Sequence, residues 1–274
     1  MKSHLNYETF VRDNQEYLQS FRDKRVIVAY SGGKDASVIL HFLIQAKEEF
    51  GFDFETHTIM YPKHIYYYEA ERLDSYWKAR GVRITWHPIS EDGSSFETAR
   101  LKGKNLCEVC IAVKRKYSLQ YFERTVTDWN SLSIIIGWSL WDIVGYTQEY
   151  LFGSVYADRE SPYQGEKIKD RFFRTSQRFY PMLRMKEGYT LYKPLLRYND
   201  QDIHRVVREN SIPILNTHCL CEFRPKRVFA EAYTKMDLYF DYDKVMKFSQ
   251  EELNLQKPSS YTDLHKEEFI TSIF

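Results

Sequence analysis

A glycine-rich bend between an apolar run and an amphipathic segment is the feature of this sequence best suited to chemistry. Residues 26–40 read "VIVAYSGGKDASVIL". A strand, a tight turn and a helix start direct backbone N–H groups and the positive end of a helix dipole toward one point, which favours a bound phosphate. Glycine lets the backbone approach a ligand closely, lysine neutralises phosphate charge, and an aspartate there holds a cation or caps the helix. The candidate nucleotide-binding residues of the bend are Tyr30, Ser31, Gly32, Gly33, Lys34, Asp35 and Ser37.

The spacing of the bend separates it from the two commonest nucleotide loops. It contains neither G-x-x-x-x-G-K-[ST] nor G-x-G-x-x-G, so an ordinary P-loop NTPase and a dinucleotide-binding enzyme are both disfavoured. The plain alternative is a glycine turn followed by a capped helix. That alternative does not explain why a strand, two adjacent glycines, a lysine and a helix start occur together in this segment.

The four cysteines fall into two pairs that are far apart in the sequence. Cys107 and Cys110 lie in "NLCEVCIAVKRK", and Cys219 and Cys221 lie in "NTHCLCEFRP". A Cys-x-x-Cys pair at a helix start places both thiols on one side, near a dipole that favours thiolate. Two such pairs suit one metal or cluster site assembled in space. Buried core thiols and a redox disulfide are the alternatives.

Strand-like and helix-like segments alternate along most of the chain, and this alternation must position both features. It predicts an α/β fold with a five-stranded parallel sheet flanked by helices, and a ligand site at the carboxyl ends of the strands. A helix leads into the first strand, and helical segments form the tail after Pro213. We expect a loop at "SEDGSS" (90–95) and find no clear period over 153–188. The expected strands are 25–30, 52–60, 82–89, 131–139 and 189–196, and the expected helices are 4–22, 35–50, 64–80, 107–126, 140–152 and 200–210.

Composition restricts the protein class without identifying a partner. The 274 residues carry a net charge of +1, so no global field indicates nucleic acid or membrane. No segment approaches the roughly 18 apolar residues of a membrane span, and the N-terminus does not resemble a signal peptide. We therefore expect a cytoplasmic protein with reduced cysteines and no membrane partner.

The segment "SGGKDAS" resembles the signature S-G-G-x-D-S of the PP-loop family, the N-type ATP pyrophosphatases. Its first five positions match, and Ala36 stands where the family usually has serine. The resemblance implies a Rossmann-like fold of the adenine nucleotide alpha-hydrolase type. It also implies ATP bound with its pyrophosphate in the loop, Mg²⁺, and cleavage between the α and β phosphates. A substrate oxygen would be adenylated and become a leaving group. Met60 and Gly137 are two further candidate nucleotide contacts.

The cysteines narrow this resemblance to the tRNA-thiolating members of the family, notably the 2-thiocytidine synthetase group. Those enzymes carry C-x-x-C followed by basic residues, and a later cysteine after an Ile-Pro turn; the similar segments here extend over roughly residues 25–235. In them three cysteines hold a [4Fe–4S] cluster with one open iron. The resemblance therefore implies a cluster on Cys107, Cys110 and either Cys221 or Cys219, with zinc as the alternative metal.

One segment departs from the family pattern. The family has a G-H-x-x-D-D-like segment after the fourth strand, and this chain reads "GWSLWDIVGY". Gly137 and Asp142 are kept, whereas Trp138 and Trp141 replace polar residues. The resemblance leaves Lys34, Asp35 and Asp142 as candidate catalytic residues and indicates a divergent substrate.

Basic residues interleaved with aromatics suggest contact with RNA. Phosphate-binding side chains beside stacking surfaces are what an extruded base needs, although a charge run is also typical of a plain solvated face. The basic residues are Arg100, Lys102, Lys104, Lys114, Arg115, Lys116, Lys167, Lys169, Arg171, Arg174, Arg178 and Arg184, and the interleaved aromatics are Phe172, Phe173, Phe179 and Tyr180.

These observations favour an ATP-dependent sulfur transferase that acts on a nucleobase carbonyl, in tRNA or another nucleobase-containing substrate. It would need a sulfur donor, and a homodimer is compatible with the sequence. The alternatives are an enzyme similar to phosphoadenylyl-sulfate reductase, whose E-C-G-x-H motif is absent from the tail, and a divergent nucleotide-binding module with a structural zinc. The expected organisation is an N-terminal helix (1–23), an ATP-binding α/β domain (24–216, with 153–188 as an irregular insertion) and a cysteine loop with a helical tail (217–274).

Overall fold

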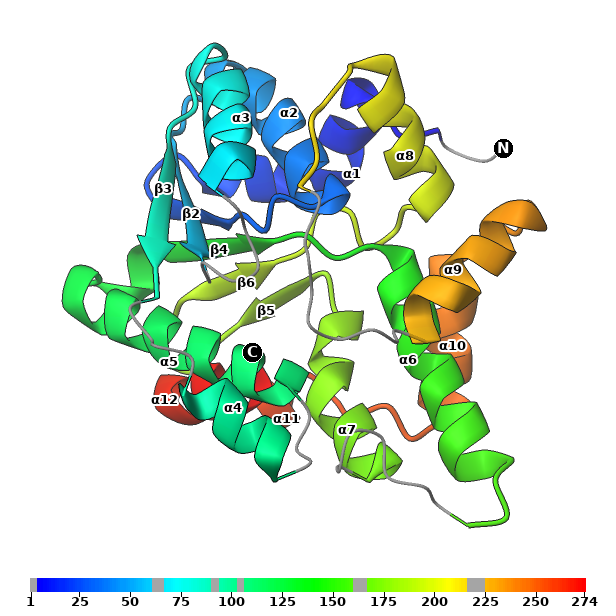
Figure 1. Cartoon of the computed structure of the whole chain (residues 1–274). Helices are drawn as coiled ribbons and strands as arrows, with labels where there is room; N and C mark the ends of the chain where they lie inside the picture. Colours follow the sequence, from blue (N-terminus) through cyan, green and yellow to red (C-terminus); the bar gives the residue numbers. More distant parts are fainter. Residues whose placement is uncertain (1–3, 61–66, 90–93, 103–105, 160–166, 216–224) are drawn as a thin grey trace. The chain divides into compact units, whose positions relative to one another are not determined.

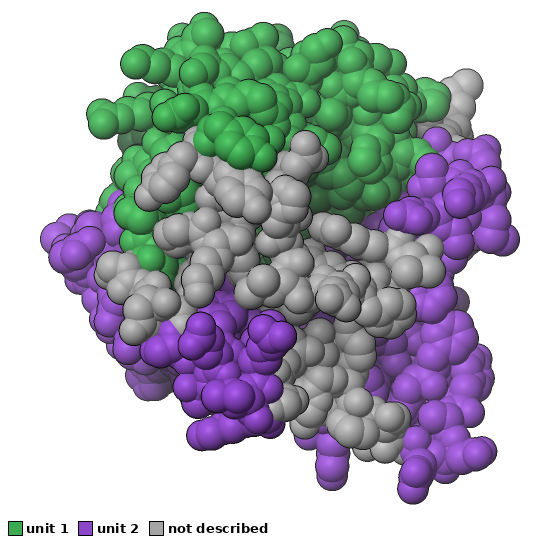
Figure 2. Space-filling model, viewed as in Figure 1, with its two compact units in different colours: residues 1–89, 128–140, 181–218 green, residues 90–127, 141–180, 219–274 purple. Residues whose placement is uncertain are grey.

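The computed structural model describes residues 4–60, 67–89, 94–102, 106–159, 167–215 and 225–274. The chain divides into two compact units, coloured separately in Figure 2. Unit 1 comprises residues 1–89, 128–140 and 181–218, and unit 2 comprises residues 90–127, 141–180 and 219–274. No helix among the described residues is both long enough and apolar enough to cross a membrane.

All strands of the described sheet belong to unit 1. Their order is β3-β2-β1-β4-β6-β5, and every neighbouring pair is parallel except β5 with β6. The predicted α/β fold with a parallel five-stranded sheet is confirmed, and one antiparallel edge strand, β5, is added to it. The strands are β1 Arg25–Ala29, β2 Phe54–Met60, β3 Ile84–Pro88, β4 Leu132–Ile136, β5 Met182–Arg184 and β6 Thr190–Tyr192.

The two central strands are apolar because both of their faces are covered. β1 reads "RVIVA" with its three middle residues buried, and β4 reads "LSIII" with its first four residues buried. Continuous apolar runs of this kind are typical of parallel strands. Val28 pairs with Thr56 of β2 and Ile135 of β4, so the carboxyl ends of these three strands lie side by side.

Four helices of unit 1 lie on one side of this sheet (Figure 1). Many of their buried residues form one apolar cluster with part of the buried strand residues; it runs from Leu5 to Leu215 and includes Phe10, Leu43 and Trp77. The helices are α1 Tyr7–Ser20, α2 Lys34–Phe50, α3 Tyr67–Lys78 and α8 Asp200–Glu209, and the short 3₁₀ helix η1 spans Trp129–Ser131.

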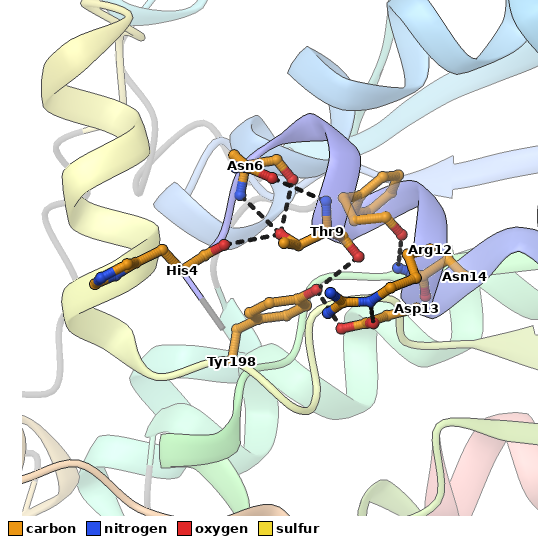
Figure 3. Close-up of polar contacts among 8 residues, drawn as sticks. His4, Asn6, Thr9, Arg12, Asp13, Asn14 and Tyr198 are labelled. Atoms are coloured by element: carbon orange, nitrogen blue, oxygen red, sulfur yellow. Dashed lines mark hydrogen bonds and ion pairs between the residues drawn. The ribbon is translucent and has the colours of Figure 1, made fainter. Parts of the chain in front are cut away.

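The N-terminal helix α1 is fixed at its start by a capping box. The Asn6 side chain accepts from the Thr9 N–H at 2.8 Å, and the Thr9 hydroxyl accepts from the Asn6 N–H at 3.0 Å. The hydroxyl of Tyr198 lies 2.6 Å from Asp13 Oδ2 and 3.1 Å from the Thr9 carbonyl oxygen (Figure 3). These bonds join α1 to the segment that precedes α8.

The described part of unit 2 is mainly helical. Two of its elements differ from the expectation: α4 begins at Ser94 inside the expected loop, and α7 with η3 gives regular structure within the segment that shows no period. Only Ile168, Phe172 and Thr175 of α7 are buried, which is too short a pattern to stand out in the sequence. The elements are α4 Ser94–Leu101, α5 Leu106–Thr125, α6 Leu140–Tyr150 (whose first residue belongs to unit 1), π-helix η2 Leu151–Val155, α7 Ile168–Thr175, η3 Ser176–Phe179, α9 Pro225–Lys235, α10 Tyr242–Glu252, α11 Ser259–Thr262, α12 Lys266–Glu268 and π-helix η4 Phe269–Ile273.

Candidate functional site

The glycine bend forms the strand–turn–helix junction that the sequence predicts. β1 ends at Ala29 and α2 begins at Lys34, with Gly33 as the residue that precedes the helix. Glycine has no side chain with which to cap a helix, so Gly33 contributes no capping side chain at the start of α2, where the helix dipole favours an anion. Asp35 in the first turn of α2 adds a negative charge close to this helix start.

Both the backbone angle and the surroundings at position 32 require glycine. The φ of Gly32 is +73°, in the region that favours glycine. A Cβ on Gly32 would lie 2.8 Å from Leu215 Cβ. The Leu215 N–H donates to the Gly32 carbonyl at 2.7 Å, so the segment that leaves α8 is bonded directly to the bend.

The structure brings Gly137 to the start of α2, as expected of a residue that follows β4. A Cβ on Gly137 would lie 2.8 Å from the backbone nitrogen of Ala36 and 3.2 Å from its Cα. Met60, the last residue of β2, is buried in the apolar cluster of unit 1. The carboxyl ends of β1, β2 and β4 therefore converge on the bend, which is where open α/β sheets bind ligands.

Tyr30 and Ser37 direct their side chains into unit 1. Both are buried, and the Tyr30 hydroxyl lies 3.2 Å from Ser37 Oγ and accepts from Trp77 Nε1 at 2.9 Å. Burial raises the pKa of the Tyr30 hydroxyl, which keeps it protonated. Any nucleotide contact from these two residues would come from their backbone groups. Ser31 is exposed, and its hydroxyl accepts from the Gly33 N–H at 3.3 Å.

Lys34 is held between two carboxylates of unit 1. Its Nζ lies 2.9 Å and 3.0 Å from the two oxygens of Asp35 and 2.7 Å from Asp200 Oδ1. Asp200 Oδ2 lies 3.5 Å from His204 Nε2. Burial acts to raise the pKa of Asp200, but the hydrogen bond from His204 and the charge of Lys34 outweigh it and lower that pKa below its ordinary value. These carboxylates are the hard oxygen ligands that Mg²⁺ prefers, so the residues present fit the implied ion.

Sequence reasoning did not identify Asp200 as a site residue. The available signal was its place as the first residue of α8, the helix that follows the fifth parallel strand, β6. An acidic residue at that place faces the same end of the sheet as the bend.

Asp142, the third candidate catalytic residue, lies in the first turn of α6 and belongs to unit 2. Burial lowers the pKa of Arg178 below its ordinary value. The charge of Asp142 acts in the opposite direction and offsets part of this lowering. The neighbouring Trp141 is buried, with its ring centroid 5.4 Å from that of Tyr233 and 5.7 Å from that of Phe240. This departure from the family pattern therefore supplies a core residue of unit 2.

The predicted metal ligands fall partly within the described residues. Cys107 and Cys110 lie three residues apart at the start of α5, so the helix places both positions on one side. Cys110 is half-buried. Cys219 and Cys221 lie outside the described residues, and the complete ligand set stays a prediction.

Several residues of the expected RNA-contact set have packing roles instead. Phe172 and Phe179 are buried in unit 2 with their ring centroids 5.7 Å apart, so neither can stack on a base. Arg178 is buried beside Tyr146. Arg115 Nη2 donates to the Phe274 carbonyl at 3.2 Å. Phe173 is exposed, and its contact with RNA stays a prediction.

No protein-family model and no curated protein matches this sequence. Solved structures do match it. The U34-tRNA thiolase NcsA from Methanococcus maripaludis, solved with its [4Fe–4S] cluster, is 14% identical, with 96% of this chain and 88% of that chain covered at a TM-score of 0.61. This likeness confirms the fold that the PP-loop resemblance implies.

Two synthetase structures are more distant. The NMN synthetase from Francisella tularensis is 10% identical, with 97% of this chain and 93% of that chain covered at a TM-score of 0.42. The NH₃-dependent NAD synthetase from Campylobacter jejuni, in complex with nitrate ion, is 13% identical, with 93% and 90% covered at a TM-score of 0.41.

Proposed function

We propose that this protein is an ATP-dependent sulfur transferase that adenylates a nucleobase carbonyl, most suitably in tRNA, and replaces its oxygen with sulfur. The observation that carries the proposal is the bend itself. Gly32 and Gly33 lead into α2, Lys34 is the first residue of this helix, and Gly137 packs against the backbone of its first turn. The thiolase likeness and the Cys-x-x-Cys pair on α5 support the choice of sulfur chemistry.

The first step is a transfer of AMP. The carbonyl oxygen of the base attacks the α-phosphorus of ATP, the bond to the β-phosphate oxygen breaks, and pyrophosphate leaves. The N–H groups at the start of α2 and the Lys34 ammonium would stabilise the leaving pyrophosphate. Asp35 would hold the Mg²⁺ ion that accompanies ATP, and Asp142 is a further candidate catalytic residue, as the resemblance implies.

The second step exchanges oxygen for sulfur. A hydrosulfide donor attacks the activated carbon and loses its proton, and AMP departs with the former carbonyl oxygen, which leaves a thiocarbonyl. A [4Fe–4S] cluster, when bound, would supply the chemistry of holding and delivering sulfur. Cys107, Cys110 and either Cys221 or Cys219 would hold this cluster, with Zn²⁺ as the alternative occupant of the same thiolates.

The proposal assigns the protein a nucleobase-containing substrate and a separate sulfur donor, in the cytoplasm. The exposed basic residues of unit 2, among them Lys167 and Lys169 beside Phe173, would contact the RNA backbone. A homodimer is compatible with this arrangement.

Anaerobic purification tests the cluster, and product analysis tests the ATP chemistry. We expect a brown protein containing iron and acid-labile sulfide, and release of AMP and pyrophosphate with bulk tRNA that is lost in Asp35→Ala. A colourless protein with stoichiometric zinc would refute the cluster. ADP as the sole product would refute α–β cleavage.

A catalytically divergent nucleotide-binding module is the second candidate. The packing of Trp141 against Tyr233 and Phe240, at a position where the family is polar, is the observation that favours it. Binding of ATP without any release of AMP would support this candidate over the transferase.

A further inference from the structure

Asp200 is given no role in the function proposed above, yet its ion pair with the lysine of the bend is shorter than that of Asp35. The Lys34 Nζ to Asp200 Oδ1 distance is 2.7 Å, against 2.9 Å for Asp35 Oδ2. All three side chains are mostly shielded from solvent, with exposed fractions of 21% for Lys34, 18% for Asp35 and 11% for Asp200. Shielding strengthens the interactions among charges at this place.

One ammonium therefore faces two carboxylates. A phosphate that reaches the bend needs the Lys34 ammonium, and it meets Asp35 and Asp200 as competitors for it. A metal-free polyphosphate brings only negative charge to this place. A polyphosphate complexed with Mg²⁺ brings a cation that can replace the ammonium beside the carboxylates.

The two carboxylates differ in how they are held. Asp35 follows Lys34 in the same helix turn, and both of its oxygens lie within 3.0 Å of the ammonium. Asp200 comes from α8, where its second oxygen faces His204. Loss of the Asp200 charge would therefore leave Lys34 positioned by Asp35 and would remove only the competitor contributed by α8.

We propose that Asp200 is a specificity-determining residue of the nucleotide site: its carboxylate competes with phosphate for Lys34 and so favours magnesium-bound ATP over metal-free polyphosphates. This role rests on the proposed nucleotide function of the bend and adds a discrimination that the bend alone does not provide.

Calorimetric titration of the full chain tests this role with two ligands, ATP in excess EDTA and ATP in excess Mg²⁺. In Asp200→Asn we expect metal-free ATP to bind at least about fivefold more tightly, since one nearby opposing charge is lost. The affinity for magnesium-bound ATP should fall, because one of the two carboxylates that receive the cation is lost, so the preference for magnesium-bound over metal-free ATP decreases. Asp200→Glu should restore the wild-type ratio, and Asp200→Ser provides a second neutral variant if the asparagine variant folds poorly.

Asp202→Asn is the matched control, because Asp202 is buried on the same helix and pairs with Arg205 at 2.9 Å. It should leave the ratio unchanged. Labelling of Lys34 by a small amine-reactive acylating reagent, followed by mass spectrometry without nucleotide, reports on the ion pair independently. The labelling rate should rise about fivefold in Asp200→Asn and not in Asp202→Asn.

The outcomes separate this role from the function on which it rests. A protein that binds magnesium-bound ATP with the same affinity ratio in wild type, Asp200→Asn and Asp200→Ser would overturn the role of Asp200 alone. A wild-type protein that binds neither form of ATP would contradict the proposed function and this role together. Unchanged Lys34 labelling in both neutral variants would contradict the ion pair itself.

Discussion

Replacing Gly137 by alanine tests whether the segment after β4 and the first turn of α2 form one rigid support for the bend. The new Cβ would lie 2.8 Å from the Ala36 nitrogen, 3.2 Å from the Ala36 Cα and 3.3 Å from the Asp35 carbonyl carbon. All three atoms are backbone, so no rotamer change relieves the contact. The two segments must separate.

The size of the effect follows from these distances. Ordinary contacts of a Cβ begin at 3.4 Å, so the Ala36 nitrogen must retreat by about 0.6 Å (3.4 minus 2.8). Overpacking of a tightly packed region costs about 1–3 kcal/mol, and we expect about 2 kcal/mol for Gly137→Ala. Because the displaced atoms belong to the first turn of α2, the N–H groups that would receive phosphate move as well. We expect ATP affinity to fall about tenfold, which corresponds to a loss of about 1.4 kcal/mol of binding free energy at the displaced N–H groups.

Urea denaturation followed by circular dichroism measures the stability change, and calorimetry measures ATP affinity. Gly153→Ala is the matched control, because its Cβ would also meet an atom at 2.8 Å, but that atom is Cγ1 of the Ile168 side chain in unit 2. The control should lower stability and leave ATP affinity unchanged. If Gly137→Ala unfolds at the same urea concentration as wild type and binds ATP equally well, the reasoning about this support is refuted.

Three further substitutions test other contacts of unit 1. Gly32→Ala should destabilise by about 2–3 kcal/mol, from a φ of +73° and a contact of 2.8 Å with Leu215 Cβ. Leu215→Gly, which removes that Cβ, should recover part of the loss in a double-mutant cycle. Tyr30→Phe removes the hydroxyl that accepts from Trp77 at 2.9 Å. We expect it to lower the free energy of unfolding, measured by chemical denaturation, by about 1–2 kcal/mol, and unchanged stability would contradict this expectation. The hydrogen bond from Arg25 lowers the pKa of Glu55 from 4.5 to about 2. The ion pair therefore stabilises the folded state fully above pH 4.5, and this stabilisation is lost as the pH falls toward 2. Because 44% of the Glu55 side chain is exposed, the effect should be below about 1 kcal/mol, and Glu55→Gln should flatten the stability profile between these pH values; an unchanged profile would count against it.

The elements around the bend were accessible to sequence reasoning because their signals are local. β1 is a continuous apolar run, and α2 follows with its apolar residues at helical spacing until Gly51, whose φ is +69°. The strand β5 gives no such signal. It has three residues, two of them exposed, and it forms only by pairing with β6.

The site was predicted where its parts are close in sequence or where a residue follows an expected strand, as Gly137 follows β4. Lys34 and Asp35 are neighbours, whereas Asp200 reaches them through the folding of α8 against α2, which no local pattern records. The aromatic residues near the basic segment show a related difficulty. Phe172 is buried and Phe173 is exposed, and the choice between the two depends on which face of α7 packs.

The bond between the Leu215 N–H and the Gly32 carbonyl has a thermodynamic consequence. Leu215 lies in the segment that leaves α8, the helix that begins with Asp200, so one backbone bond joins the nucleotide bend to that segment. If a phosphate reorients the Gly32 peptide, the strength of this bond changes, and nucleotide binding is thereby coupled to the position of Leu215. Linkage is reciprocal, so a substitution that displaces Leu215 would alter the affinity for nucleotide.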